Sequence, residues 1–180
     1  MKARVLSLLG ALGLLAGCAT ERPPDVTSYY DNVSGQRTDL LSDNLLKAPG
    51  KPREVVWLNA SRIFRSPTRS DYHLEVNYQA KAETGYLDIP PGATLTLILD
   101  GFPMKFSGMG SGNLRKQFKV EGVEFVSEKA IYPVTRTALQ QIAVAKQVKV
   151  QIRGNNGLIE REFAPENFEK FRSFVTRFAL

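Results

Sequence analysis

Cys18 is the only cysteine in the 180 residues, and a cysteine thiolate is the side chain best suited to act as a nucleophile near neutral pH. It lies directly behind an apolar run, residues 5–15, which follows the two cations Lys2 and Arg4. A positive head, a short apolar run and small residues before a cleavage site are the parts of a secretory signal peptide. The run is shorter than the ~20 apolar residues that a membrane-spanning helix needs. We therefore expect residues 1–17 to be an export signal that is removed.

The residues around the cysteine narrow this expectation. Leu15-Ala16-Gly17-Cys18 resembles the lipobox of bacterial lipoproteins at every position. The resemblance implies that the Cys18 sulfur receives a diacylglycerol, that the chain is cut before it, and that the new amino group is acylated. Several acyl chains, at ~0.8 kcal/mol per buried methylene, make a stable anchor. The alternative is a small buried cysteine in a core helix, but the glycines of the run make a poor helix interior. By the enterobacterial sorting rule, Ala19 in place of aspartate favours the outer membrane, and we expect the domain to lie on its periplasmic face.

Catalytic and metal-binding chemistry has little support elsewhere in the chain. His73 is the only histidine, and Asp71 and Glu75 would share its strand face. Such a trio could bind a metal weakly, but carboxylates and an imidazole on a flat wet face are usually just solvated. No serine lies in a nucleophile elbow, and a pair of glycosidase-like carboxylates is possible in any chain with 18 acidic residues. We expect no enzyme activity, no cofactor and no metal.

A glycine-rich segment, residues 107–113, is the first candidate for a binding surface. It resembles a phosphate-cradling loop only superficially, because such loops lead into a helix and strands are predicted on both sides here. The simple interpretation is a flexible hairpin tip; the functional one is a mobile contact loop. The exposed apolar and basic residues that would make that contact are Phe102, Lys105, Met109, Arg115 and Lys116.

Basic charge is the second candidate feature. The chain has 24 basic and 18 acidic residues, a net charge of +6. Residues 47–69 hold six of the basic residues and only one acidic residue, Glu54; the six are Lys47, Lys51, Arg53, Arg62, Arg65 and Arg69. The segment is either a solvated face or a binding site for anions. Export makes nucleic acid an unexpected partner and leaves anionic lipid headgroups, lipopolysaccharide phosphates or acidic envelope proteins.

The elements that must position these residues are mostly strands. Alternating or continuous apolar patterns predict strands over 55–64, 72–78, 94–99, 130–134, 148–153 and 158–163. The apolar phase within 118–125 flips at Gly122, which predicts a bulge or a tight turn. One helix is expected from a capping box at Thr137 and Gln140. A second opens at Pro165 with a stripe that packs on the sheet: Phe168, Phe171, Phe174, Val175 and Phe178.

These patterns predict an α+β fold, a mainly antiparallel sheet packed by two helices of which the second is C-terminal. We expect three segments along the chain: a signal peptide over 1–17, a lipidated tether over 18–52 and a single domain over 53–180. The tether includes a possible short helix over 38–46.

Two functions compete at this point. The first is a non-enzymatic accessory lipoprotein that is anchored in the outer membrane and docks an envelope protein. The second is a binding module for an anionic envelope polymer or lipid, such as lipopolysaccharide or peptidoglycan. The anchor supports both, the glycine-rich loop favours the first, and the basic segments favour the second.

The anchor gives a direct test. Cys18→Ser removes the sulfur that a lipid would modify, so we expect the variant to lose membrane anchoring and to incorporate no fatty-acid probe in labelled cells. A wild-type protein that takes up no label would contradict the lipoprotein assignment.

Overall fold

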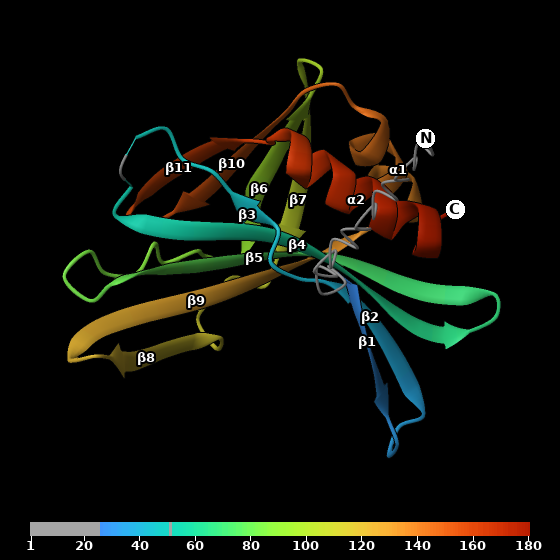
Figure 1. Cartoon of the computed structure of the whole chain (residues 1–180), viewed down its shortest axis with the longest axis horizontal. Coiled ribbons are helices and arrows are strands. Elements are labelled where there is room, and N and C mark those ends of the chain that lie inside the picture. The colour runs from blue at the N-terminus through green and yellow to red at the C-terminus, as the bar shows by residue number, and fades with distance from the viewer. Residues whose placement is uncertain (1–25, 51) are drawn as a thin grey trace, which may run out of the picture.

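The computed structural model describes residues 26–50 and 52–180, which form two antiparallel sheets and two helices (Figure 1). Sheet A has the strand order β1-β2-β4-β5-β9-β8, with β3 also paired to β4. Its strands are β1 (Val26–Asp31), β2 (Gln36–Leu41), β3 (Leu45–Leu46), β4 (Glu54–Ser66), β5 (Arg69–Lys81), β8 (Arg115–Val120) and β9 (Val123–Val134).

Sheet B has the order β11-β10-β6-β7. Its strands are β6 (Gly92–Leu99), β7 (Phe102–Gly108), β10 (Val148–Gly154) and β11 (Gly157–Glu162), and the helices are α1 (Arg136–Val144) and α2 (Pro165–Phe178). Mostly antiparallel sheets with two helices, the second C-terminal, confirm the predicted fold class. Within the described residues, neither helix has the length and apolar character needed to cross a bilayer.

The core lies between sheet A and a layer made of sheet B and both helices. Figure 1 shows that layer on one side of β4, β5 and β9. Strand alternation assigns the side chains: on β4, Val56, Leu58 and Ala60 are buried toward this layer, which we call the inner face of sheet A. Trp57 points to the opposite, outer face and is half-buried. One sheet thus offers two surfaces of different chemistry.

Helix α2 packs as its apolar stripe predicts. Pro165 occupies the first turn, where its missing N–H is not needed, and Phe171 and Phe174 are fully buried. Phe178, which was also expected in the core, is only partly buried. It lies in the last turn of α2, beside Arg62 of β4 and Tyr72 of β5.

Helix α1 begins two residues earlier than predicted. Its N-cap is Thr135, whose hydroxyl accepts the N–H of Ala138 at 3.1 Å, so the capping box at Thr137 and Gln140 is wrong. The phase flip at Gly122 is confirmed as a tight turn between β8 and β9. Both turn residues, Glu121 and Gly122, have positive φ, 49° and 86°, as hairpin turns of this type require.

The expected tether is the main correction to the predicted layout. Residues 38–46 are not helical; they span the end of β2, a short connection and β3, and both strands pair with β4. Leu41 and Leu46 are buried, and Val26 in β1 is too. The folded unit therefore includes residues from Val26 onward instead of beginning near Arg53. An amphipathic pattern this short fits either a helix or a strand, and pairing with β4 decides between them.

The burial of α2 predicts that replacing phenylalanine with alanine lowers stability far more at Phe171 than at the exposed Phe102. Phe171→Ala should lower the free energy of unfolding by about 3–5 kcal/mol, because it empties a fully buried site. The control Phe102→Ala, at a side chain that is 78% exposed, should change it by less than about 0.5 kcal/mol. Chemical denaturation measures both, and similar losses would mean that α2 does not dock on the core.

Candidate functional site

The five predicted contact residues do not form one surface. Phe102 begins β7 and Met109 follows its last residue. Seven residues of strand, at about 3.3 Å each, separate them by roughly 23 Å. Both are exposed, 78% and 87% respectively. Lys105 is an exposed residue midway along β7, and Lys116 is exposed on β8, in the other sheet. The five residues therefore do not share one ligand surface, because Phe102 and Lys105 lie in the other sheet from Lys116.

The glycine-rich segment is not a hairpin tip, because β7 and β8 belong to different sheets. It is a connection that packs against the chain after β5. Gly110 has a φ of 76°, and a Cβ there would come within 2.7 Å of the Ile89 carbonyl oxygen. Ser111 is fully buried, and its N–H donates to the same carbonyl at 2.9 Å. The flexible loop predicted here is a tight inter-sheet crossing.

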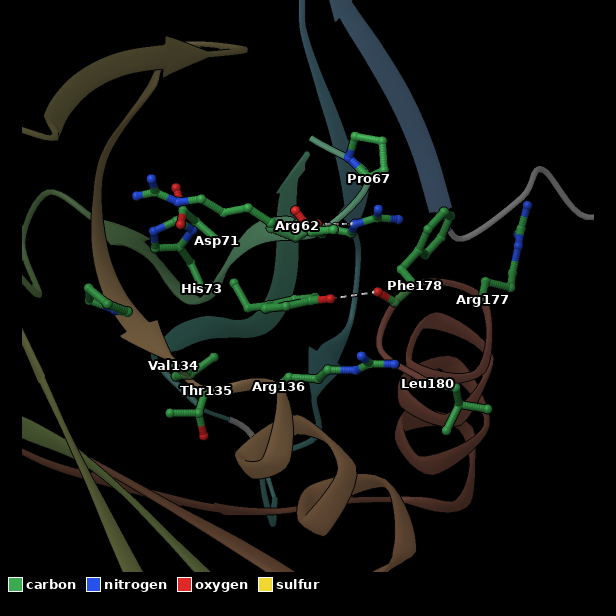
Figure 2. A pocket seen from close by; sticks show the side chains of 15 residues that line it. Arg62, Pro67, Asp71, His73, Val134, Thr135, Arg136, Arg177, Phe178 and Leu180 are labelled. Carbon is green, nitrogen blue, oxygen red and sulfur yellow. Dashed lines mark hydrogen bonds between the residues drawn. The ribbon is translucent and has the colours of Figure 1, made fainter. Parts of the chain in front are cut away.

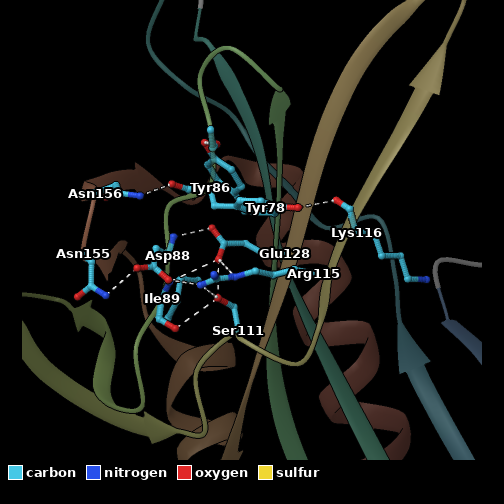
Figure 3. Close-up of polar contacts among 11 residues, drawn as sticks. Tyr78, Tyr86, Asp88, Ile89, Ser111, Arg115, Lys116, Glu128, Asn155 and Asn156 are labelled. Atoms are coloured by element: carbon cyan, nitrogen blue, oxygen red, sulfur yellow. Dashed lines mark hydrogen bonds and ion pairs between the residues drawn. The ribbon is translucent and has the colours of Figure 1, made fainter.

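A buried carboxylate, Glu128 on β9, explains why the crossing is held so closely (Figure 3). Only 2% of Glu128 is exposed. Its side chain accepts the N–H of Asp88 at 2.9 Å, the N–H of Ile89 at 3.4 Å and the hydroxyl of Ser111. The guanidinium of Arg115 lies 3.7 Å away. These donors offset the cost of removing the charge from water.

Arg115 is therefore part of the framework rather than a free contact residue. It also forms an ion pair with Asp88, which accepts the side-chain amide of Asn155 at 2.8 Å. The Asn155 hydrogen bond, followed by the one from Arg115, lowers the pKa of Asp88 below its ordinary value of 3.8. Burial, with smaller contributions from Glu54 and Glu128, raises the pKa of Tyr78 beside this cluster to about 12.

The expected weak metal trio is divided among other partners. Asp71 pairs with Arg65 at 2.8 Å, and Glu75 pairs with Lys129 at 3.0 Å. Across residues 26–50 and 52–180, no group of three or more His, Cys, Asp or Glu side chains is arranged to hold a metal ion. Cys18, the predicted lipidation site, lies outside the described residues.

The strongest candidate site is a pocket of about 590 Å³ beside the last turn of α2 (Figure 2). Four arginines line it, each from a different element: Arg62 of β4, Arg69 of β5, Arg136 of α1 and Arg177 of α2. We call it the arginine pocket. Three of the four arginines are exposed and Arg62 is half-buried, so the site is open to solvent on a rigid base.

Three interactions fix the base of this pocket. The Arg62 Nε donates to the Ser70 hydroxyl at 3.0 Å, and its guanidinium lies 5.0 Å from the centre of the Phe64 ring. The Arg136 Nε donates to the Ala179 carbonyl at 3.0 Å. Arg69 and Arg177 make no ion pair with any residue in the described part of the chain. They are the two cations of the pocket that remain available to a ligand.

The end of α2 completes the pocket. The Tyr72 hydroxyl donates to the Phe178 carbonyl at 2.9 Å, and the Phe178 ring lies within 6 Å of three guanidinium groups: Arg37 at 5.9 Å, Arg62 at 5.9 Å and Arg177 at 5.3 Å. Such cation–π contacts help to orient the arginines, while the buried carboxylate of Asp39 pairs with Arg37 at 2.8 Å and with Arg62 at 3.6 Å. Phe178 is thus only partly buried because its ring lines this pocket.

The lining of the pocket has an excess of positive charge, although Arg62 is paired with the buried carboxylate of Asp39 at 3.6 Å. Its lining holds four arginines against one acidic side chain, Asp71. Arg65, outside the lining, already pairs with Asp71, and its hydrogen bond lowers the pKa of that carboxyl below the ordinary 3.8. Asp71 therefore stays ionised, but Arg65 already balances its negative charge.

Comparison with protein-family models, curated proteins and solved structures found no match for this chain.

The contacts of Glu128 predict that its removal lowers stability strongly, whereas removal of the exposed Glu124 on the same strand does not. Glu128→Ala should cost about 3–5 kcal/mol of unfolding free energy, because it leaves two backbone N–H groups unpaired and Arg115 with Asp88 alone. Glu124→Ala, an exposed site on the same strand, should stay within about 0.5 kcal/mol. Denaturant titration checks both, and a Glu128→Ala loss below about 1 kcal/mol would contradict the proposed framework role.

Proposed function

We propose that this chain is a non-enzymatic lipoprotein, anchored in the outer membrane through Cys18, whose folded domain binds an anionic group of an envelope polymer or lipid in the arginine pocket. The observation that carries the binding part is the convergence of four arginines from four elements on one pocket. The anchor part rests on the residues 15–18 motif alone. Together they favour the second of the two functions expected from the sequence.

Arginine chemistry supports an anionic ligand. A guanidinium stays charged at every physiological pH and presents a planar fork of N–H donors that matches a carboxylate or a phosphate. In this pocket, two of the guanidiniums donate hydrogen bonds to protein partners, whereas Arg69 and Arg177 make no hydrogen bond or ion pair with their side chains among the described residues. The first pair gives the site a fixed shape, while the second pair can turn toward a bound anion.

The first expected function, docking of an envelope protein through the glycine-rich segment, loses its structural basis in part. Phe102 and Met109 remain exposed apolar side chains, but they lie at opposite ends of β7, and Arg115 is held by two carboxylates. Docking at either end alone stays a hypothesis, which a pulldown from envelope extracts with the Phe102→Ala and Met109→Ala variants tests.

The test compares two arginine changes with a matched control. The double variant Arg69→Gln/Arg177→Gln should bind inorganic polyphosphate or alginate about tenfold more weakly, since exposed ion pairs contribute up to about 1 kcal/mol each. Arg153→Gln, at an exposed arginine of β10, should bind like wild type. Calorimetry on the mature chain in a nonionic detergent measures these affinities, and the two probes separate phosphate from carboxylate ligands.

Salt provides the second measurement. Binding to the pocket should weaken steeply between about 0.1 M and 1 M salt, over which the screening length falls from about 10 Å to about 3 Å. Equal binding by the double variant and the wild type would overturn the proposal. Loss of envelope binding in Phe102→Ala or Met109→Ala instead would support protein docking.

A further inference from the structure

The outer face of sheet A carries a second concave site, of about 510 Å³. It lies on the side of β4, β5 and β9 that neither helix nor sheet B covers (Figure 1). We call it the Trp57 groove. The lining residues that matter to its chemistry are Trp57, Asn77, Gln79, Asn113, Ser127 and Lys129. The arginine pocket contributes none of them.

Strand register arranges these side chains in two matching rows. In one row, Trp57 of β4 lies opposite Asn77 of β5, which lies opposite Lys129 of β9. In the next row, Val55 lies opposite Gln79, which lies opposite Ser127. Each row therefore runs from an apolar side chain, through an amide, to a polar one.

The dimensions of this pattern suit a ring-shaped ligand. Neighbouring strands are about 4.8 Å apart, so each row spans about 10 Å from its first to its last side chain. The groove thus has an apolar platform on one side and hydrogen-bonding groups on the other, within the reach of one or two small rings.

The key side chains of the groove are free to bind. Trp57, Asn77 and Gln79 are half-buried, and within residues 26–50 and 52–180 their side chains make no hydrogen bond or ring contact. An indole is the largest flat apolar surface that a protein offers, and it is usually packed or hydrogen-bonded when buried. A primary amide both donates and accepts hydrogen bonds. The indole of Trp57 and the amides of Asn77 and Gln79 lie side by side, and together they form a surface suited to a ligand with an apolar face and polar edges.

The charge of the groove argues against an anion. Lys129 is paired with Glu75 at 3.0 Å, and the lining residues Arg115 and Glu128 compensate each other. Lys116 is the remaining cation of the lining. The groove is therefore close to neutral, in contrast to the arginine pocket.

We propose that the Trp57 groove binds an uncharged saccharide. One sugar ring stacks its apolar C–H face on the indole of Trp57, and its hydroxyl or acetamido groups exchange hydrogen bonds with the amides of Asn77 and Gln79. A hydroxyl donates and accepts at once, as an amide does, whereas a lysine only donates and a carboxylate only accepts. The volume of the groove lies within the range of about 300–1,000 Å³ that is typical of ligand sites. This inference is independent of the proposed function at the arginine pocket.

The chain carries its own reporter for the test, since Trp57 is its only tryptophan. The mature chain is titrated with tetra-N-acetylchitotetraose or with maltotetraose in a polyoxyethylene detergent, which contains no sugar. We expect a saturable change in tryptophan emission with at least one probe. The apparent Kd should not change between about 0.1 M and 1 M salt, because no ion pair contributes to binding.

Three variants complete the experiment. Asn77→Ala and Gln79→Ala should each weaken binding by about tenfold, the effect of losing one well-placed hydrogen bond. Gln141→Ala, at an exposed glutamine of α1, should bind like wild type.

Three outcomes would overturn the proposal. One is no change in emission with either sugar at about 10 mM, ten times a Kd of about 1 mM. The second is full binding by both Asn77→Ala and Gln79→Ala, each shown by its denaturation curve to be folded. The third is sugar binding that weakens with salt.

Discussion

The carboxylate of Glu128 is removed from water on the inner face of sheet A, and a buried charge of this kind persists only if donors surround it. Its donors come from chain segments with no regular structure, namely the 88–89 stretch after β5 and the crossing at Ser111. Asp88 then extends the network to Asn155, in the turn between β10 and β11. That turn fits closely, since a Cβ on Gly154 would come within 2.0 Å of the Leu87 carbonyl oxygen. One buried group thereby aligns the loops that hold the two sheets together.

The regular parts of the fold follow from local pattern. Residues a few positions apart decide the alternation along β5 and β10, the turn at Gly122 and the phenylalanine stripe of α2. The sequence therefore predicted these features. The N-terminal strands could not be predicted this way. The side-chain amide of Asn44 donates a hydrogen bond to the Leu58 carbonyl at 2.6 Å, and its oxygen accepts one from the Asn167 amide at 2.8 Å. Partners 14 and 123 residues away decide where this loop lies, and no local pattern encodes them.

The candidate site was only partly predictable for the same reason. Arg62 and Arg69 belong to the basic segment seen in the sequence, but Arg136 and Arg177 come from the two helices. They reach the pocket because Tyr72 and Arg136 both donate to carbonyls at the end of α2, which fixes that end over sheet A. Other cations of the segment are used elsewhere, as Lys47 is by Glu166 at 2.9 Å. The basic charge of residues 47–69 pointed to part of the arginine pocket, but only the packing of α2 showed which arginines line it.

Strand β4 gives the two proposed sites different positions as well as different chemistry. Trp57 and Arg62 are five residues apart, so their side chains project from opposite faces, and they are separated by roughly 17 Å along the strand. No small ligand can touch both. A long polymer that carries both neutral sugars and anionic groups is the kind of ligand that could reach both proposed sites at once. The second contact is then intramolecular, and its effective concentration raises the overall affinity above that of either site. If each proposed site binds its own part of one polymer, the two weak sites together would hold a repeating polymer more tightly than a small anion.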